Sequence, residues 1–159
     1  MNSREITPEA FSRQIAFNAI PQIDVFMDND YTKEEMKMVW ETQKIMGDES
    51  ILVNATAVRV PVFYGHGEAI HIETRMPIDA EAAKQLLADA PGIKLYDSRE
   101  DFPTQVGNAS GNDFVHVGRV RNDISHPSGL NLWVVSDNIR KGAATNSVQI
   151  AEVLIRDYL

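Results

Sequence analysis

The segment GHGEAIHIETR, residues 65–75, has the alternating pattern from which the class of fold follows. From Glu68 onward, apolar and polar side chains alternate along the chain. Ile70, Ile72 and Thr74 fall on one face, and a more polar set falls on the other. A period of two with one polar face is typical of a strand in a sheet that packs on one side. Residues 65–75 therefore predict a turn followed by a half-buried strand.

The sequence before this stretch also alternates. Val58, Val60 and Val62 recur at every second position, so residues 51–76 are expected to form a strand, a turn at 64–67 and a second strand. Further short strands are expected at 93–96, 114–121 and 130–136.

A first helix is predicted at about 32–46. Thr32 and Glu35 have the spacing of a capping box, and Gly47 supplies a stop. Met36, Val39, Trp40 and Gln43 are expected to form its inward stripe.

Two more helices are predicted, at 80–90 after an N-cap at Asp79 and at about 140–157. Between them, residues 98–112 form a long polar loop, and loops of this length are often functional or interface elements. The last helix is expected to bury five apolar side chains: Ala144, Val148, Ala151, Leu154 and Ile155.

Strands interleaved with three helices indicate an α+β fold. We expect a mixed, largely antiparallel sheet with helices packed on one face, which leaves the other face free for a partner. The 159 residues suit one domain with a substantial core.

Composition excludes several classes of function. A formal charge of −8 argues against a nucleic-acid-binding surface, and the absence of cysteine rules out disulfides, thiolate zinc sites and a cysteine nucleophile within this chain. No apolar run is long enough to span a membrane, and the polar N-terminus is unlike a signal peptide. We therefore expect a cytoplasmic protein without membrane or nucleic-acid partners.

Arg59 and His66 are the strongest candidates for substrate binding and catalysis. A strand arginine can grip a carboxylate with two hydrogen bonds, and a histidine between Gly65 and Gly67 can serve as an acid or base near neutral pH. The alternative is an arginine paired with a neighbouring acid and a surface histidine. No two histidines have a spacing that predicts a metal site.

Two further places admit both a functional and a structural interpretation. Glu34 and Lys37 lie on one face of the first predicted helix, where a surface ion pair is the plain alternative. Asp137 and Asn138 lead from a strand into a helix, where either can act as a cap alone. The chain has no Gly-rich nucleotide-binding fingerprint, so it contains no complete nucleotide site.

Six motifs in order resemble the C-terminal domain of the aspartate-β-semialdehyde dehydrogenases, from about residue 15 to the end. They are FNAIPQID at 17–24, EEMK at 34–37, ETQKI at 41–45, RVPV at 59–62 with Gly65 and His66, VGRVRND at 117–123, and DNIRKGAA at 137–144. The seven-residue step from arginine to histidine also matches the family.

The resemblance implies a reaction and a role for five residues. The family makes L-aspartate β-semialdehyde from L-aspartyl 4-phosphate and NADPH. By match to its motifs, His66 would be the acid/base, Arg59 would hold the α-carboxylate and Glu34 the amino group of the substrate. Lys37 would bind phosphate, and Asn138 would lie beside the nicotinamide.

The resemblance also implies what lies elsewhere. The family's nucleophilic cysteine and its NADP-binding Rossmann domain precede this region, so residues 1–159 are expected to be a C-terminal fragment that is inactive alone. The family's domain has a mixed sheet like that of the glyceraldehyde-3-phosphate dehydrogenases, and its sheet face forms a homodimer. Two alternatives stay open: a dimerisation module without catalysis, and a paralogue acting on another acyl phosphate, such as N-acetylglutamyl phosphate.

Overall fold

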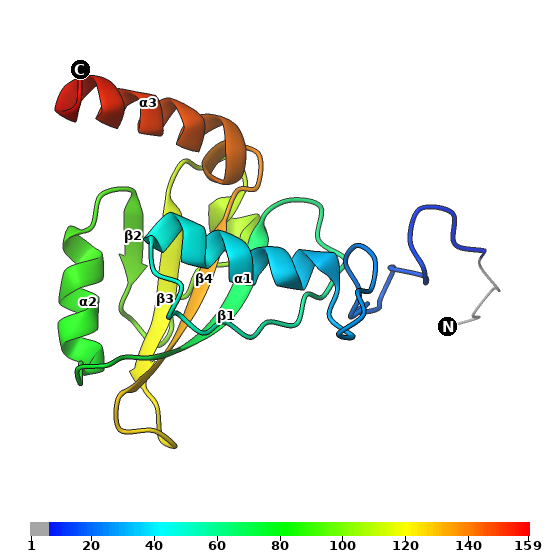
Figure 1. The fold of residues 1–159 in the computed structure, drawn as a ribbon, viewed down its shortest axis with the longest axis horizontal. Coiled ribbons are helices and arrows are strands. Elements are labelled where there is room, and N and C mark those ends of the chain that lie inside the picture. The colour runs from blue at the N-terminus through cyan, green and yellow to red at the C-terminus, as the bar shows by residue number, and fades with distance from the viewer. Residues whose placement is uncertain (1–6) are drawn as a thin grey trace. The chain divides into compact units, whose positions relative to one another are not determined.

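The computed structural model describes residues 7–159, which fall into two compact units. The first ends at Pro61 and the second begins at Val62. Figure 1 traces both from blue to red, and each unit is described by itself.

The first unit is built around one helix, α1 (Lys33–Met46). The predicted capping box is confirmed: the Thr32 hydroxyl accepts the Glu35 N–H while the Glu35 carboxylate accepts the Thr32 N–H. Gly47 ends the helix in the left-handed conformation, at φ 63°. The predicted inward stripe is wrong in part, because Trp40 is 46 % exposed and Glu35 is the buried residue of the helix.

The strand predicted from Val58 to Val62 is wrong. Only Arg59 pairs, in a single antiparallel bridge with Ile20, and the neighbouring valines stay partly exposed. Alternating valines form a strand only when a neighbouring strand satisfies their backbone groups, and Pro61 has no N–H to donate to a ladder.

The second unit contains a four-stranded sheet in the order β1-β4-β3-β2. Strand β1 (His66–Glu73) pairs antiparallel with β4 (Gly129–Ser136), β4 pairs antiparallel with β3 (Val115–Asn122), and β3 pairs parallel with β2 (Ile93–Tyr96). The prediction of a mixed, largely antiparallel sheet is therefore confirmed. Figure 1 shows the long strands side by side, with β3 and β4 forming a hairpin.

One face of the sheet holds the core of this unit. Helix α2 (Ala80–Asp89) packs there, and the buried cluster consists of Ala83 from the helix with Val117, Val120 and Leu130 from the sheet. The Asp79 side chain caps the helix by accepting the Ala82 N–H at 2.8 Å. Burial of these apolar side chains holds helix and sheet together.

The opposite face is partly covered by the segment predicted as a polar loop. This segment contains a π-helical turn, η1 (Gln105–Ala109), and its Pro103 carbonyl accepts the indole N–H of Trp133 at 2.9 Å. Gly118 is required beneath it, because a Cβ there would lie 2.6 Å from the Pro103 ring. The segment is thus built against the sheet.

The chain ends in a π-helical turn, η2 (Arg140–Ala144), and α3 (Thr145–Asp157). The expected burial of the apolar face of α3 is wrong: none of its residues is buried, and Ile155 is 66 % exposed. Among residues 7–159, no helix combines the length and apolar character needed to cross a bilayer.

Candidate active site

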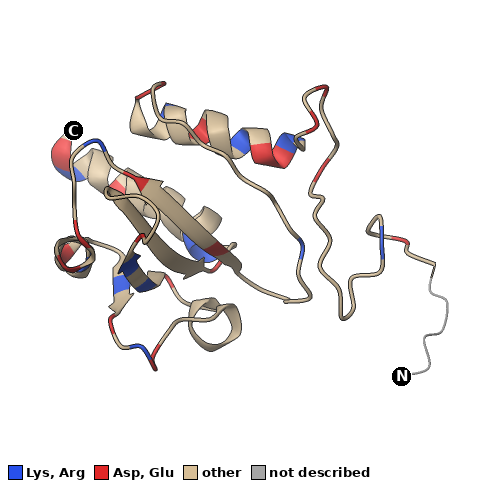
Figure 2. Cartoon of the chain, turned by 90° about the horizontal axis from the view of Figure 1, so that it is seen from below, with Lys and Arg blue, Asp and Glu red and all other residues tan. Residues whose placement is uncertain are grey.

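Glu34 and Lys37 lie one turn apart on α1 and form an ion pair. The Lys37 ammonium is 3.1 Å from the Glu34 carboxylate, and both side chains are about one-third to two-fifths exposed. The hydrogen bond and charge of Glu34 raise the pKa of Lys37 above its ordinary value, so the ammonium stays charged at neutral pH. Figure 2 shows acidic and basic positions alternating closely along the ribbon of this helix.

Glu35, between them, is the residue that fixes this part of the unit. It is 7 % exposed, and its two carboxylate oxygens accept the Thr32 N–H at 2.7 Å and the Ala57 N–H at 2.8 Å. These backbone hydrogen bonds, first that of Thr32 and then that of Ala57, lower the pKa of the carboxyl below its ordinary value. One carboxylate therefore joins the start of α1 to the segment that carries Arg59.

Arg59 is held by backbone pairing and lines a hollow. Its N–H and carbonyl exchange two 2.9 Å hydrogen bonds with Ile20, and its guanidinium lies 5.2 Å from the centre of the Phe11 ring. The hollow has a volume of about 150 Å³, and Gln22 and Asp24 also line it. A basic and an acidic residue, Arg59 and Asp24, thus line one small space, which suits a ligand that bears both an anion and a cation.

His66 and Asn138 come together at one end of the sheet in the second unit. His66 is the first residue of β1 and pairs with Ser136, the last residue of β4. Two residues later, the Asn138 side-chain oxygen accepts the N–H of Gly65 at 3.4 Å. The antiparallel register therefore places the histidine turn beside the exit from β4.

Gly65 is required at this turn. It has φ 80°, in the left-handed region, and a Cβ there would lie 3.0 Å from the Ser136 carbonyl oxygen. Any larger residue would be strained and would push the turn away from β4.

The structure groups the predicted site residues by unit. It brings together Glu34 and Lys37, and separately His66 and Asn138, while Glu35 links the helix to the segment of Arg59. Sequence reasoning missed the long-range contacts of Glu35 and the place of Asp24 beside Arg59. The capping-box spacing pointed to Glu35 as a cap, but no sequence signal marked its bond to Ala57.

Comparison with known proteins decides the family. Residues 1–141 match the model of the semialdehyde dehydrogenase dimerisation domain. The chain belongs to this family. It is similar to an aspartate-semialdehyde dehydrogenase from Shewanella sp. (strain DB6705), 70 % identical over 153 residues that cover 96 % of the chain and 45 % of that relative. The chain thus spans about half the length of the curated relatives it matches.

Solved structures show the same likeness. Aspartate semialdehyde dehydrogenase II of Vibrio cholerae, in complex with ASA, matches with a TM-score of 0.92 and 69 % identity over 96 % of the chain and 45 % of its own. The enzyme of Candida albicans, solved with NADP, matches with a TM-score of 0.72 and 28 % identity over 88 % of the chain and 45 % of its own.

The double role of Glu35 predicts the effect of removing its charge. Glu35→Gln keeps one acceptor oxygen, so one of the two buried backbone N–H groups loses its partner. We expect the melting temperature to fall by roughly 3–6 °C in differential scanning calorimetry. The matched control is Glu34→Gln, which removes a partly exposed ion pair and should change the melting temperature by less than about 2 °C. Equal melting temperatures for the two variants would contradict the role of Glu35.

Proposed function

We propose that this chain is the substrate-holding, C-terminal part of an aspartate-semialdehyde dehydrogenase that reductively dephosphorylates L-aspartyl 4-phosphate with NADPH. The observation that carries the proposal is the 70 % identity to an aspartate-semialdehyde dehydrogenase over nearly the whole chain. The ASA complex of the Vibrio cholerae relative and the NADP complex of the Candida albicans relative support the ligands.

The charges of the first unit fit the substrate. Aspartyl phosphate bears an α-carboxylate, an α-ammonium and a phosphate. The Arg59 guanidinium matches the carboxylate with two donors, the Glu34 carboxylate matches the ammonium, and the Lys37 ammonium matches the phosphate. Because Glu34 and Lys37 pair at 3.1 Å without substrate, binding would exchange one ion pair for two with the ligand.

His66 would move protons at the reacting carbon. In this proposal a cysteine, supplied by the part of the enzyme outside this chain, attacks the acyl phosphate and phosphate leaves. His66 would accept the thiol proton before the attack. After reduction of the thioester to a thiohemiacetal, it would take the hydroxyl proton as the C–S bond breaks, which releases the aldehyde and the cysteine sulfur. The glycines on either side of it let the turn pack closely against its own unit, because a Cβ on Gly65 would lie 3.0 Å from the Ser136 carbonyl oxygen and one on Gly67 would lie 2.9 Å from the Trp133 ring.

Asn138 fits the nicotinamide end of the cofactor. Its side-chain oxygen is bonded to Gly65, which leaves its amide N–H₂ as a donor for the carboxamide oxygen of nicotinamide. Bound NADPH would supply the hydride. The chain lacks a phosphate-binding loop, so the proposal assigns the ribose and phosphate contacts to a Rossmann domain that precedes this region.

The proposal includes a homodimer formed through the sheet face opposite α2. A hollow of about 360 Å³ opens there, lined by apolar side chains that include Phe102 and Trp133 and by the exposed Arg119 and Arg121. An apolar surface with two exposed arginines, bordered by the segment at 102–104, suits a second copy of this acidic chain. The family description as a dimerisation domain supports this assignment.

Complementation in trans tests the proposed reaction. We expect the chain alone to show no phosphate-dependent reduction of NADP by aspartate semialdehyde, because it has no cysteine. Adding the NADP-binding half of the Shewanella relative as a separate polypeptide should restore turnover. His66→Asn should then lower kcat by at least about 100-fold.

The control is His71→Asn, an exposed histidine further along β1, which should leave turnover unchanged. Turnover by the chain alone would overturn the argument from the missing thiol. Association of the two halves without turnover would favour the dimerisation module, and turnover with N-acetylglutamyl substrates in place of aspartyl ones would favour the paralogue.

Sedimentation equilibrium tests the dimer. At tens of micromolar we expect a species of twice the 17.8 kDa chain mass. Arg121→Glu, which replaces a long cation in the hollow with a shorter anion, should weaken the dimer by roughly tenfold or more, because the carboxylate would lose its water against the apolar surface of the hollow. Arg13→Glu, on the first unit, should leave the equilibrium unchanged. A wild-type chain that sediments only as a monomer would contradict the proposed interface.

A further inference from the structure

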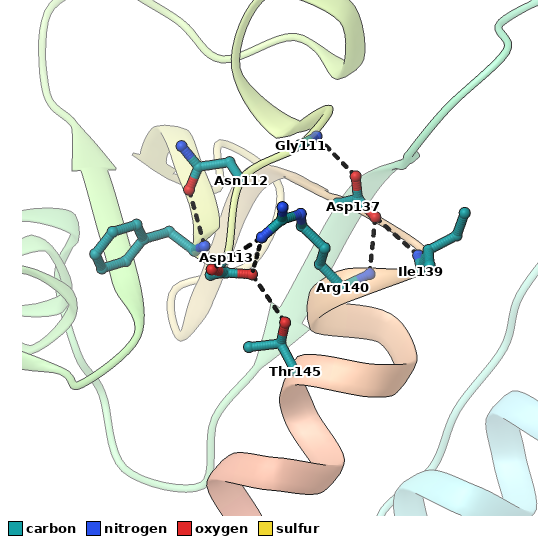
Figure 3. Close-up of polar contacts among 8 residues, drawn as sticks. Gly111, Asn112, Asp113, Asp137, Ile139, Arg140 and Thr145 are labelled. Carbon is teal, nitrogen blue, oxygen red and sulfur yellow. Dashed lines mark hydrogen bonds and ion pairs between the residues drawn. The ribbon is translucent and has the colours of Figure 1, made fainter.

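We propose that Asp137 is a positioning residue that sets the place of Asn138 against the His66 turn. The effect of this positioning on catalysis rests on the function proposed above, whereas the positioning itself can be measured without that function. Asp137 and Asn138 lie at the exit of β4, where the chain leaves the sheet after Ser136 and enters η2 (Figure 3).

The Asp137 carboxylate fixes the backbone on the far side of Asn138. One oxygen accepts the N–H groups of Ile139 and Arg140, both at 2.8 Å, and the Asp137 carbonyl accepts the Gly142 N–H at 2.9 Å. The peptide on each side of Asn138 is therefore tied to Asp137. This leaves Asn138 little freedom to move along or across the junction.

The second carboxylate oxygen reaches across to another segment. It accepts the N–H of Gly111 at 2.8 Å, so the loop after η1 is joined to the same junction. Asp137 is 6 % exposed, and the backbone N–H groups of Arg140 and then Gly111 lower its pKa below the ordinary value. The group thus stays ionised and fully bonded at neutral pH.

Asp113 is a second link between the same loop and the terminal helix. Its carboxylate accepts the Arg140 guanidinium at 3.1 and 3.2 Å and the Thr145 hydroxyl at 2.8 Å. Figure 3 shows both contacts, which are to the side chains of Arg140 and Thr145 and therefore to residues that follow Asn138 in the sequence. Asp113 therefore holds the helix without touching the backbone beside Asn138.

The bond from Asn138 to the His66 turn depends on precise placement. The Asn138 oxygen accepts the Gly65 N–H at 3.4 Å, near the limit of a useful hydrogen bond, so a shift of a few tenths of an ångström would break it. Gly65 directly precedes His66. The chain of contacts runs from the Asp137 carboxylate through Asn138 to the backbone that presents the histidine.

Amide hydrogen exchange of Gly65, measured by NMR on the full chain, reads this bond directly. We expect Asp137→Asn, which loses one acceptor oxygen, and Asn138→Ala, which loses the acceptor itself, each to speed Gly65 exchange by roughly tenfold. The double variant should add nothing further. Asp113→Asn removes an equal charge from the loop that Asp137 contacts through Gly111, and it should leave Gly65 exchange within about twofold of wild type.

If Asp137→Asn lowers the melting temperature and leaves Gly65 exchange unchanged, Asp137 is a helix cap alone and the proposal fails. If Asp137→Asn does not fold, Asp137→Ser takes its place, because the hydroxyl can cap η2 without reaching Gly111. Unchanged Gly65 exchange in Asn138→Ala overturns the proposal in either case.

A second readout separates positioning from stability. In the two-chain enzyme, Asp137→Asn should lower kcat by roughly tenfold and change KM for aspartate semialdehyde by less than about twofold, because the substrate-holding residues are elsewhere. Asp113→Asn should change neither. A fall in kcat that Asp113→Asn shares would contradict a specific positioning role. An inactive wild-type mixture would defeat the proposed function, and the exchange result would still decide this inference.

Discussion

Two buried carboxylates, those of Glu35 and Asp137, accept backbone N–H groups that no helix or strand satisfies. Each joins the start of a helical segment to a stretch of irregular chain: Glu35 to Ala57, and Asp137 to Gly111. A buried N–H without an acceptor is costly, so an irregular segment keeps one position only where such a partner exists. Four of the five candidate site residues lie within two positions of these contacts along the chain: Glu34, Lys37, Arg59 and Asn138. His66 is the exception, and it is held by the pairing of β1 with β4.

This arrangement explains how loop-like segments can hold precise chemistry. Arg59 lies two residues beyond Ala57, and Asn138 directly follows Asp137. Neither is in the middle of a strand or helix, where a ladder of hydrogen bonds would fix it. The carboxylates supply that constraint, and the glycine at 65 allows the His66 turn to approach β4 closely.

In the proposed function, the two units supply different kinds of side chain. The first supplies charges that match the ends of the substrate, and the second supplies the acid/base group and an amide for the cofactor. The thiol and the rest of the cofactor site belong, in the proposal, to the other half of the enzyme. The absence of cysteine excludes a thiol nucleophile within this chain, and the proposal therefore takes that group from outside the chain.

Local sequence patterns predicted the elements that stabilise themselves or pair with near neighbours. The capping box at Thr32 and the alternation after Glu68 predicted α1 and β1, and the class of the sheet followed from them. Alternation at Val58–Val62 failed, because a strand needs a partner and the pattern carries no information about one. The expected burial of the apolar face of α3 failed for a similar reason. Helical periodicity shows that one face of a helix is apolar, but it does not show which element covers that face.

Some features of the candidate site could likewise be predicted from the sequence, and others could not. Its residues were identified through the resemblance, because charge and spacing alone left each of them an ordinary structural alternative. The ion pair of Glu34 and Lys37 could be expected from a spacing of three on a helix. The contacts of Glu35 and Asp137 with distant backbone could not, since they join positions 22 and 26 residues apart.

Titration of the carboxyl groups tests the account most directly. With the Asp and Glu carboxyl carbons labelled with ¹³C, each group can be followed by NMR from neutral to acid pH, in the folded chain and in the urea-unfolded chain. Because hydrogen bonds lower the folded-state pKa of Glu35 and Asp137, both contribute stability above their unfolded pKa that is lost as the pH falls through the folded pKa, beginning below about pH 5. The account predicts that both groups titrate at lower pH folded than unfolded. Identical titration in the two states would contradict it.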